Sequence, residues 1–319
     1  MPETPEVFME PKEETPLVTV VTPSYNSARY LEETVRSVLS QDYPNIEYIV
    51  LDADSTDGSQ DILARYKDRL SMYIRPDTGT SDAIQSGFEL SHGAVFTFLC
   101  ADDTLLPGAV SAAVRALNAH PEVSGVYGDG WWVDETGNRL ASYPTRPFER
   151  DLLMHECYIC QPASFVRSEA VRAAGGYNRR LGYTYDYEFW LRLTRNANLL
   201  YIKEFLANSR MHRETKTLGR RHKVFRETMQ VLKQQGGYVP FRWVYSYCCH
   251  MLDGRDQFFE PLRPSLGKYI VSLLVGSAHN SRRLLRYWRE WFAVMSVEGL
   301  VRLWSASRLA RALSGWRRD

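Results

Sequence analysis

Two adjacent aspartates, Asp102 and Asp103, follow the uncharged, β-prone stretch Ala94–Leu99. Such a stretch is typical of a strand buried on both faces, and open α/β sheets bind ligands where their strands end. Neighbouring carboxylates repel each other, so a fold that keeps them usually supplies a cation or basic side chains. A hard divalent ion that carries phosphate on its other side suits such a pair. The alternative is a helix cap or turn that leads into Leu105–Pro107.

A second acidic cluster, Asp52–Gly58, follows another strand-like segment, Ile46–Leu51. Because both clusters lie at the carboxyl ends of expected parallel strands, we expect them to face one crevice. Turn chemistry and a helix cap account best for the Thr56-Asp57-Gly58 part of the cluster.

Strands and helices alternate through the first half of the chain, which predicts right-handed βαβ units and an α/β fold with a mostly parallel, twisted sheet flanked by helices. The expected strands are Leu17–Thr22, Ile46–Leu51, Met72–Ile74, Ala94–Leu99 and Val123–Tyr127. In the first expected helix, Leu31, Val35 and Val38 form a stripe that should face the core. After Gly128 the pattern changes to hairpin-like segments.

Several nucleotide-binding and hydrolytic motifs are missing from the sequence. The first strand leads into Thr22–Asn26 instead of a GxGxxG motif, and no GxxxxGK[ST] or GxSxG motif occurs. We therefore do not expect dinucleotide, P-loop or serine-hydrolase chemistry. The lone CxxC at Cys157–Cys160 has no partner pair at zinc-finger spacing, so buried free thiols in a reducing cytosol are the preferred interpretation.

Charge is distributed unevenly along the 319 residues, although the net charge is only +1. Residues 1–239 carry a net charge of −6, whereas residues 240–319 carry +7 and five of the eight tryptophans. The acidic, Pro-rich segment 1–16 predicts a disordered leader without a signal peptide. No apolar window is long enough for a membrane-spanning helix.

The motifs together resemble the inverting family 2 glycosyltransferases of the GT-A fold. The resemblance covers roughly residues 16–217. The segments that carry it, in chain order, are Pro23–Asn26, Asp52–Ser59, Asp77–Gly87, Asp102-Asp103, Gln161–Arg167, Gly175–Tyr177, Asp186–Arg192 and Arg210–His212.

The resemblance implies a site for a nucleotide-diphospho-sugar donor. Asp103 would be the ligand of a Mg²⁺ or Mn²⁺ ion that neutralises the diphosphate leaving group, and Asp102 would bind the donor ribose or metal-bound water. Asp52 lies where the family places its base-binding acids. Alanine follows it instead of a second acid, and Asp54 is the candidate substitute. The remaining donor-side residues are expected to be Pro23, Ser24, Tyr25 and Asp82, with a core position as the alternative for Tyr25.

On the acceptor side, the resemblance makes Asp186 the general base that takes the proton from the acceptor hydroxyl. A tyrosine stands before it where the family usually has glutamate, so Glu188 is kept as the alternative base, and a helix N-cap is the structural alternative for Asp186. His212, in the family's Arg-x-His motif, is expected to complete the metal or diphosphate site, although a lone histidine is more often structural.

The domain organisation expected from these patterns has three parts. Segment 1–16 is the leader, and 17–217 is the GT-A domain, divided into a Rossmann-like nucleotide-sugar half at 17–128 and an acceptor half at 129–217. Residues 218–319 form a helical, basic and Trp-rich appendage. In Arg282–Met295 apolar residues should line one face and arginines the other, and Gly299–Trp316 continues the pattern.

The function expected from the resemblance is metal-dependent, inverting sugar transfer to a glycan or lipid-linked acceptor in cell-surface polysaccharide synthesis, with UDP-sugars favoured as donors. An inactive nucleotide-sugar-binding partner of a glycan-assembly complex and a sugar nucleotidyltransferase are the alternatives. The expected location is cytoplasmic. Segment 281–319 would contact the inner face of the plasma membrane or pack on protein, and no nucleic-acid binding is expected.

Overall fold

The computed structural model describes residues 15–254 and 265–294, which form two compact units. Unit 1 comprises the described part of 1–148 together with 159–180 and 193–210. Unit 2 comprises 149–158, 181–192 and the described part of 211–319. The predicted leader and Gly299–Trp316 lie outside the described residues, apart from the last two leader positions, and the predicted domain boundaries remain predictions.

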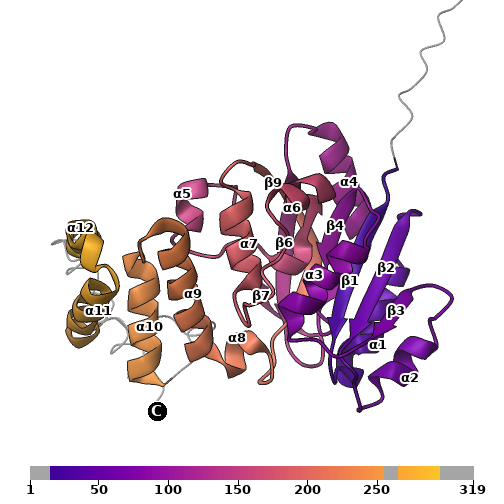
Figure 1. The fold of residues 1–319 in the computed structure, drawn as a ribbon, viewed down its shortest axis with the longest axis horizontal. Coiled ribbons are helices and arrows are strands. Elements are labelled where there is room, and N and C mark those ends of the chain that lie inside the picture. The colour runs from indigo at the N-terminus through magenta and orange to yellow at the C-terminus, as the bar shows by residue number, and fades with distance from the viewer. Residues whose placement is uncertain (1–14, 255–264, 295–319) are drawn as a thin grey trace, which may run out of the picture. The chain divides into compact units, whose positions relative to one another are not determined.

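Unit 1 is built on a nine-stranded sheet with the order β3-β2-β1-β4-β8-β6-β9-β5, and β7 pairs with β6 (Figure 1). The strands β3, β2, β1 and β4 pair in parallel, and β6 pairs in parallel with β9. The other pairs are antiparallel. The strands are β1 (Val18–Ser24), β2 (Ile46–Asp52), β3 (Ser71–Ile74), β4 (Val95–Phe98), β5 (Thr104–Leu105), β6 (Gly125–Val133), β7 (Arg139–Ser142), β8 (Ser164–Arg167) and β9 (Leu199–Arg210). The predicted parallel sheet is therefore confirmed for the first half, and the second half is mixed.

Helices cover both faces of this sheet. On one face Leu31, Val35 and Val38 of α1 are buried as predicted, in one core cluster with residues of α2 and α4. On the other face α3 approaches so closely that a Cβ on Gly87 would lie 2.5 Å from Val21. The helices of unit 1 are α1 (Ala28–Leu39), α2 (Ser59–Ala64), α3 (Thr80–Leu90), α4 (Ala109–Ala119) and α6 (Ser168–Ala173).

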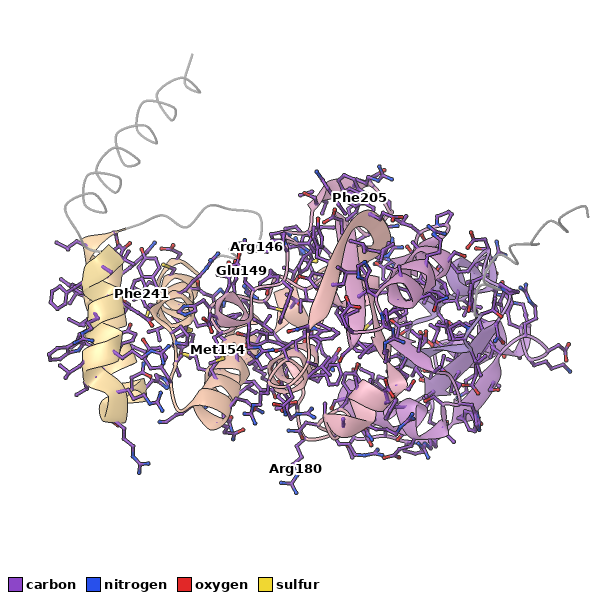
Figure 2. The ribbon with its side chains drawn as sticks, turned by 90° about the horizontal axis from the view of Figure 1, so that it is seen from above. Arg146, Glu149, Met154, Arg180, Phe205 and Phe241 are labelled. Atoms are coloured by element: carbon purple, nitrogen blue, oxygen red, sulfur yellow. The ribbon has the colours of Figure 1, made fainter. Side chains whose placement is uncertain are left out.

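Unit 2 is helical and carries its own aromatic core, in which the ring of Phe241 (labelled in Figure 2) contacts those of Tyr245, Tyr269 and Tyr287. Its helices are α5 (Arg150–Leu153), α7 (Tyr185–Leu193), α8 (Lys216–Gly219), α9 (Arg221–Gly236), α10 (Phe241–Asp253), α11 (Leu266–His279) and α12 (Leu284–Val294).

Only part of the apolar face predicted for residues 282–295 is buried in α12. Trp291 is buried in the unit 2 core, whereas Trp288 and Phe292 are 41% and 60% exposed. Among residues 15–254 and 265–294, no helix has the length and hydropathy that a membrane span requires.

Candidate active site

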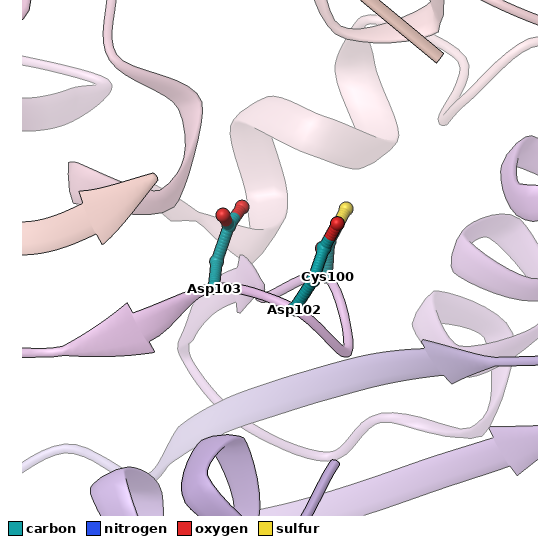
Figure 3. A group of neighbouring side chains, drawn as sticks. All are labelled: Cys100, Asp102 and Asp103. Atoms are coloured by element: carbon teal, nitrogen blue, oxygen red, sulfur yellow. The ribbon is translucent and has the colours of Figure 1, made fainter. Parts of the chain in front are cut away.

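The turn that follows β4 brings three potential metal ligands together. The ligand atoms of Cys100, Asp102 and Asp103 all lie within 4.8 Å of one another. Their side chains project to the same side of the turn (Figure 3). Asp103 is buried, and the other two are partly exposed. The sequence predicted the two aspartates as a pair, and the structure adds the thiol of Cys100.

Two distant elements hold this turn in place. The backbone N–H of Arg210, at the end of β9, donates to Oδ1 of Asp103 at 2.9 Å. The side chain of Arg210 donates through Nε to the carbonyl oxygen of Asp102, also at 2.9 Å. From α1, the hydroxyl of Thr34 donates to the carbonyl oxygen of Asp103 at 2.7 Å. The backbone beneath the acid pair is therefore fixed by β9 and α1.

Arg210 is buried, with 3% of its surface exposed, and its guanidinium contacts several neighbouring elements. It donates to Glu33 at 2.6 Å and to the carbonyl oxygen of Asp134 at 3.3 Å. It also lies over the ring of Tyr30, 4.8 Å from the ring centre. Arg210 thus links α1, the turn after β4 and the turn after β6.

The pKa of the Asp103 carboxyl is raised well above its usual range. Burial is the main cause and the neighbouring charge of Asp102 adds to it, whereas the N–H and the positive charge of Arg210 act in the opposite direction. A buried acid beside a second acid gains from a nearby cation. Carboxylate oxygens are ligands that Mg²⁺ and Mn²⁺ prefer, whereas a thiol suits softer metals. The donor set therefore fits a hard divalent ion held through Asp102 and Asp103.

The loop after β2 is organised around Asp52, which is completely buried. Its Oδ2 accepts hydrogen bonds from the hydroxyls of Ser24 and Ser55 at 2.9 and 2.7 Å. Its Oδ1 accepts the N–H of Ser55 at 2.7 Å. These bonds give Asp52 a structural role in shaping the loop, and its predicted contact with the donor remains a prediction.

The remaining acids of this loop divide into two roles. Asp54 is exposed and has a positive φ of 60°, so its carboxylate is presented at the surface of unit 1. Asp57 accepts the N–H groups of Ala28 and Ser59, at the beginnings of α1 and α2, at 2.9 and 3.0 Å. The helix-cap interpretation of Asp57 agrees with this geometry.

The end of β1 contributes Pro23 and Ser24, which are buried, and is followed by Tyr25. The Tyr25 side chain is 65% exposed, so the alternative that placed it in the core is wrong. An exposed ring beside Asp54's loop is available for contact with a planar ligand such as a nucleobase.

Asp82 lies in the first turn of α3 and is bound by neighbours on two sides. It accepts the N–H of Thr78 at 3.1 Å and pairs with the guanidinium of Arg179. Burial alone would raise the pKa of Asp82, but these hydrogen bonds and the charge of Arg179 hold it below its usual value. Asp82 is therefore an ionised acid fixed at the beginning of α3.

In unit 2, Asp186 lies in the first turn of α7 and is partly exposed. The N–H of Glu188 donates to the carbonyl oxygen of Thr184, so Thr184, not Asp186, occupies the N-cap position. Desolvation raises the pKa of Asp186 to about 6, and the charge of Glu227 adds to the increase. A carboxylate with a pKa near neutrality is suited to general-base chemistry.

Glu188, the alternative base, is in a different environment. Its side chain is buried, and both of its oxygens accept hydrogen bonds from Arg192, at 2.9 and 2.8 Å. The amide of Gln235 donates to the same carboxylate at 2.8 Å. This arrangement makes Glu188 a structural ion-pair partner within unit 2.

His212 lies in the segment after β9 and is buried in unit 2. Its carbonyl oxygen accepts the hydroxyl of Thr215 at 2.7 Å, which fixes the turn that leads into α8. Its predicted role as a metal ligand remains a prediction.

Residues 19–173 match the model of the family described as glycosyl transferase family 2. This segment is therefore identified as a glycosyl transferase family 2 domain. It is 29% identical to an uncharacterized glycosyltransferase of Rickettsia conorii over 62% of this chain and 34% of that protein. It is 42% identical to the putative teichuronic acid biosynthesis glycosyltransferase TuaG of Bacillus subtilis over 28% of this chain and 36% of that protein. The chain spans between 30% and 64% of the length of the first five curated relatives that it matches.

Solved structures confirm the GT-A fold predicted for this chain. Residues 1–349 of TarS from S. aureus, crystallised with UDP-GlcNAc, give a TM-score of 0.61 at 15% identity and cover 84% of this chain and 82% of that one. The mannosyltransferase PcManGT from Pyrobaculum calidifontis, in complex with GDP-Man and Mn²⁺, gives 0.57 at 16% identity, over 96% of this chain and 89% of that one.

Proposed function

We propose that this chain is a metal-dependent, inverting glycosyltransferase that moves a sugar from a nucleotide-diphosphate donor to a hydroxyl group. The observation that carries the proposal is the fixed turn after β4, which holds buried Asp103 and partly exposed Asp102 together with their side chains on the same side (Figure 3). The family match supports glycosyl transfer as the reaction class.

Within the proposed donor site, Asp102 and Asp103 would hold a Mg²⁺ or Mn²⁺ ion. When bound, such an ion would offset the negative charge of the departing nucleoside diphosphate. Asp102 also hydrogen-bonds the donor ribose in this proposal. Tyr25 and Asp54 contact the nucleobase over the wall formed by Pro23 and Ser24, and Asp82 lines the pocket.

Asp186 serves as the general base in the proposed reaction. It takes the proton from the acceptor hydroxyl while that oxygen attacks the anomeric carbon from the side opposite the diphosphate. A single displacement of this kind inverts the configuration at the anomeric carbon. The pKa of about 6 supports the role, because the carboxylate is ionised at neutral pH yet basic enough to accept a proton.

For the donor we favour a UDP-sugar, because TarS was crystallised with UDP-GlcNAc. The complex of PcManGT with Mn²⁺ supports a divalent cation. For the acceptor we favour a glycan or lipid-linked glycan in cell-surface polysaccharide synthesis, because the relative TuaG is named for teichuronic acid biosynthesis.

We also propose cytoplasmic activity with peripheral contact to the inner face of the plasma membrane through segment 281–319. Exposed Leu285, Trp288 and Phe292 of α12 support this contact, together with the arginines at 282, 283 and 289. Flotation with vesicles of anionic and neutral lipid, with and without residues 281–319, tests it. Equal flotation of the truncated chain would contradict it.

A donor screen tests the proposed reaction. UDP-glucose, UDP-GlcNAc, GDP-mannose and dTDP-glucose are incubated with the chain and Mn²⁺, and release of the nucleoside diphosphate is measured. We expect turnover with a UDP-sugar that stops when EDTA is added. Turnover of no donor, or turnover that EDTA leaves unchanged, would contradict metal-dependent transfer.

A further inference from the structure

A glutamate on α9 binds the loop that leads into α7. The carboxylate of Glu227 accepts the N–H of Gly182 through Oε1 at 2.9 Å. Its Oε2 accepts the N–H groups of Tyr183 and Thr184, both at 2.7 Å, and the Thr184 hydroxyl at 3.0 Å. One side chain therefore binds three successive backbone N–H groups, all within unit 2.

The position of this loop explains why the contact matters. Thr184 is the N-cap of α7, and Asp186 follows it by two residues in the first turn. Thr184 contributes the first N–H group of α7, which has no partner within the helix, whereas the N–H groups of Gly182 and Tyr183 belong to the loop before it. The Glu227 carboxylate binds all three, so it joins the beginning of α7 to α9.

The same loop is held from α8 as well. The ammonium of Lys216 donates to the carbonyl oxygen of Gly182 at 3.0 Å and lies 5.7 Å from the centre of the Tyr185 ring. Charge-assisted hydrogen bonds of this kind are stronger than neutral ones. The loop is thus bound through its N–H groups by an acid and through a carbonyl oxygen by a base.

We propose that Glu227 is a positioning residue for the general base, holding the 182–184 loop so that the Asp186 carboxylate keeps one orientation at the start of α7. The proposal rests on the proposed function, in which Asp186 accepts the proton of the attacking hydroxyl. Small displacements of a catalytic group lower the rate strongly, because the reacting atoms must be aligned. Glu227 therefore acts on turnover without touching the donor.

The charge of Glu227 has a second effect on Asp186. It disfavours ionisation of Asp186 and raises its pKa, in the same direction as desolvation. Lys216 and Lys223 also contact the loop and its flanking rings in unit 2, and the Lys223 ammonium lies 5.9 Å from the centre of the Tyr183 ring. Removing the Glu227 charge should therefore lower the pKa of Asp186, which a purely structural contact would not do.

The experiment measures nucleoside diphosphate release from UDP-GlcNAc, UDP-glucose, GDP-mannose or dTDP-glucose, whichever the wild type turns over, from pH 4.5 to 8.5. In Glu227→Gln the amide nitrogen cannot accept a hydrogen bond, so part of the loop contact is lost. We expect kcat to fall about tenfold or more. The donor KM should stay within about twofold, and the acid limb of the kcat profile should move to lower pH.

Glu290→Gln is the matched control. Glu290 is also a carboxylate that binds a helix start, since it accepts the N–H of Phe241 at 3.0 Å, but that helix is α10. We expect this variant to retain the wild-type kcat and acid limb. Glu227→Gln with a kcat and acid limb equal to those of Glu290→Gln would overturn the proposal.

Two further variants make the result decisive. If circular dichroism shows that Glu227→Gln is unfolded, Glu227→Asp replaces it, because it keeps the charge but shortens the reach. Glu227→Asp should lower kcat and leave the acid limb of the kcat profile where it is in the wild type. A wild-type kcat in Glu227→Asp would overturn the proposal. Asp186→Asn with full turnover would instead refute the base assignment itself, so the two failures are distinguishable.

Discussion

The backbone N–H of Arg210 donates a 2.9 Å hydrogen bond to the carboxylate of Asp103, across 107 positions of the chain. The same residue bonds the carbonyl oxygen of Asp102 through its side chain. Strand β9 therefore determines where the acid pair after β4 is held. This long-range support distinguishes the turn from an ordinary surface turn, which would be stabilised by its own residues.

Replacing Arg210 with lysine should destabilise unit 1. Lysine keeps the charge and the backbone N–H but loses the planar fork that reaches Asp102, Asp134 and Glu33. We expect a loss of about 2–4 kcal/mol in the free energy of unfolding, measured by urea denaturation. Exposed Arg213 provides the control, and Arg213→Lys should change stability by less than about 0.5 kcal/mol. Equal stability of both variants would show that the Arg210 contacts contribute little.

Substitutions of Asp52 and Asp54 should have different effects: the first should lower stability, and the second should weaken donor binding. Asp52→Ala leaves the hydroxyls of Ser24 and Ser55 and one N–H without their buried acceptor, so we expect a loss of about 3 kcal/mol. Asp54→Asn should fold normally, because asparagine tolerates the positive φ at this position. Calorimetric titration with UDP should show weaker binding to Asp54→Asn. Unchanged binding would remove Asp54 from the donor site.

The titration of Asp186 should govern the pH dependence of turnover. Its pKa of about 6 predicts that kcat falls about tenfold per pH unit below pH 6 and levels off above it.

The same group should make stability depend on pH. The pKa of Asp186 is higher in the folded state than in the unfolded state, so the folded state binds the proton more tightly and loses stability as pH rises from about 4 to about 6.

Asp186→Asn should therefore lose turnover. At pH 7.5 it should also unfold with a free energy about 1–2 kcal/mol higher than that of the wild type, because asparagine carries no charge to bury. The gain is smaller than the full pKa shift implies, because Asp186 is partly exposed. Urea denaturation at pH 4 and pH 7.5 measures this difference. A destabilised Asp186→Asn at pH 7.5 would instead identify a purely structural helix-start contact.

Replacing Glu188 should lower stability and leave the pH dependence of kcat unchanged, the opposite of what we expect for Asp186. Glu188→Gln breaks a buried, two-bond pair with Arg192 and should cost about 1–3 kcal/mol of stability. Because Asp186 remains intact, the acid limb of the kcat profile should stay where it is. Loss of that limb in Glu188→Gln would make Glu188 the base.

The sequence predicted the parts of the fold that depend on local pattern. The uncharged run Ala94–Leu99 predicts β4 to within one residue at each end, and the helical stripe predicts the buried face of α1. The mixed second half was harder to predict. Strand β5 has only two residues, and β8 (SFVR) combines polar and apolar residues without a continuous apolar run like that of β4.

The pair Asp102-Asp103 and the acids of the loop after β2 could be singled out because they follow strands. Asp82 and Asp186 were singled out only through the family resemblance, and the partners of all these acids could not be predicted. Hydrogen bonds such as those between Arg210 and Asp103 or between Glu227 and Thr184 join distant segments, and no local spacing encodes them. The sequence signal for Glu227 is weak: it is the single acid of helix α9, which otherwise combines basic, polar and buried apolar residues. The sequence also does not predict that Asp52 is buried, because it shows only an acid at the start of a polar loop.

The most direct test of metal-dependent glycosyl transfer compares wild type with Asp103→Asn. Asparagine keeps an oxygen that can accept the Arg210 N–H, so the variant should fold with an unchanged melting temperature. With the best donor of the screen and saturating Mn²⁺, we expect nucleoside diphosphate release by Asp103→Asn to fall at least about a hundredfold, to the level of the wild type in EDTA. Turnover by Asp103→Asn equal to that of the wild type, with the same dependence on Mn²⁺, would contradict the account.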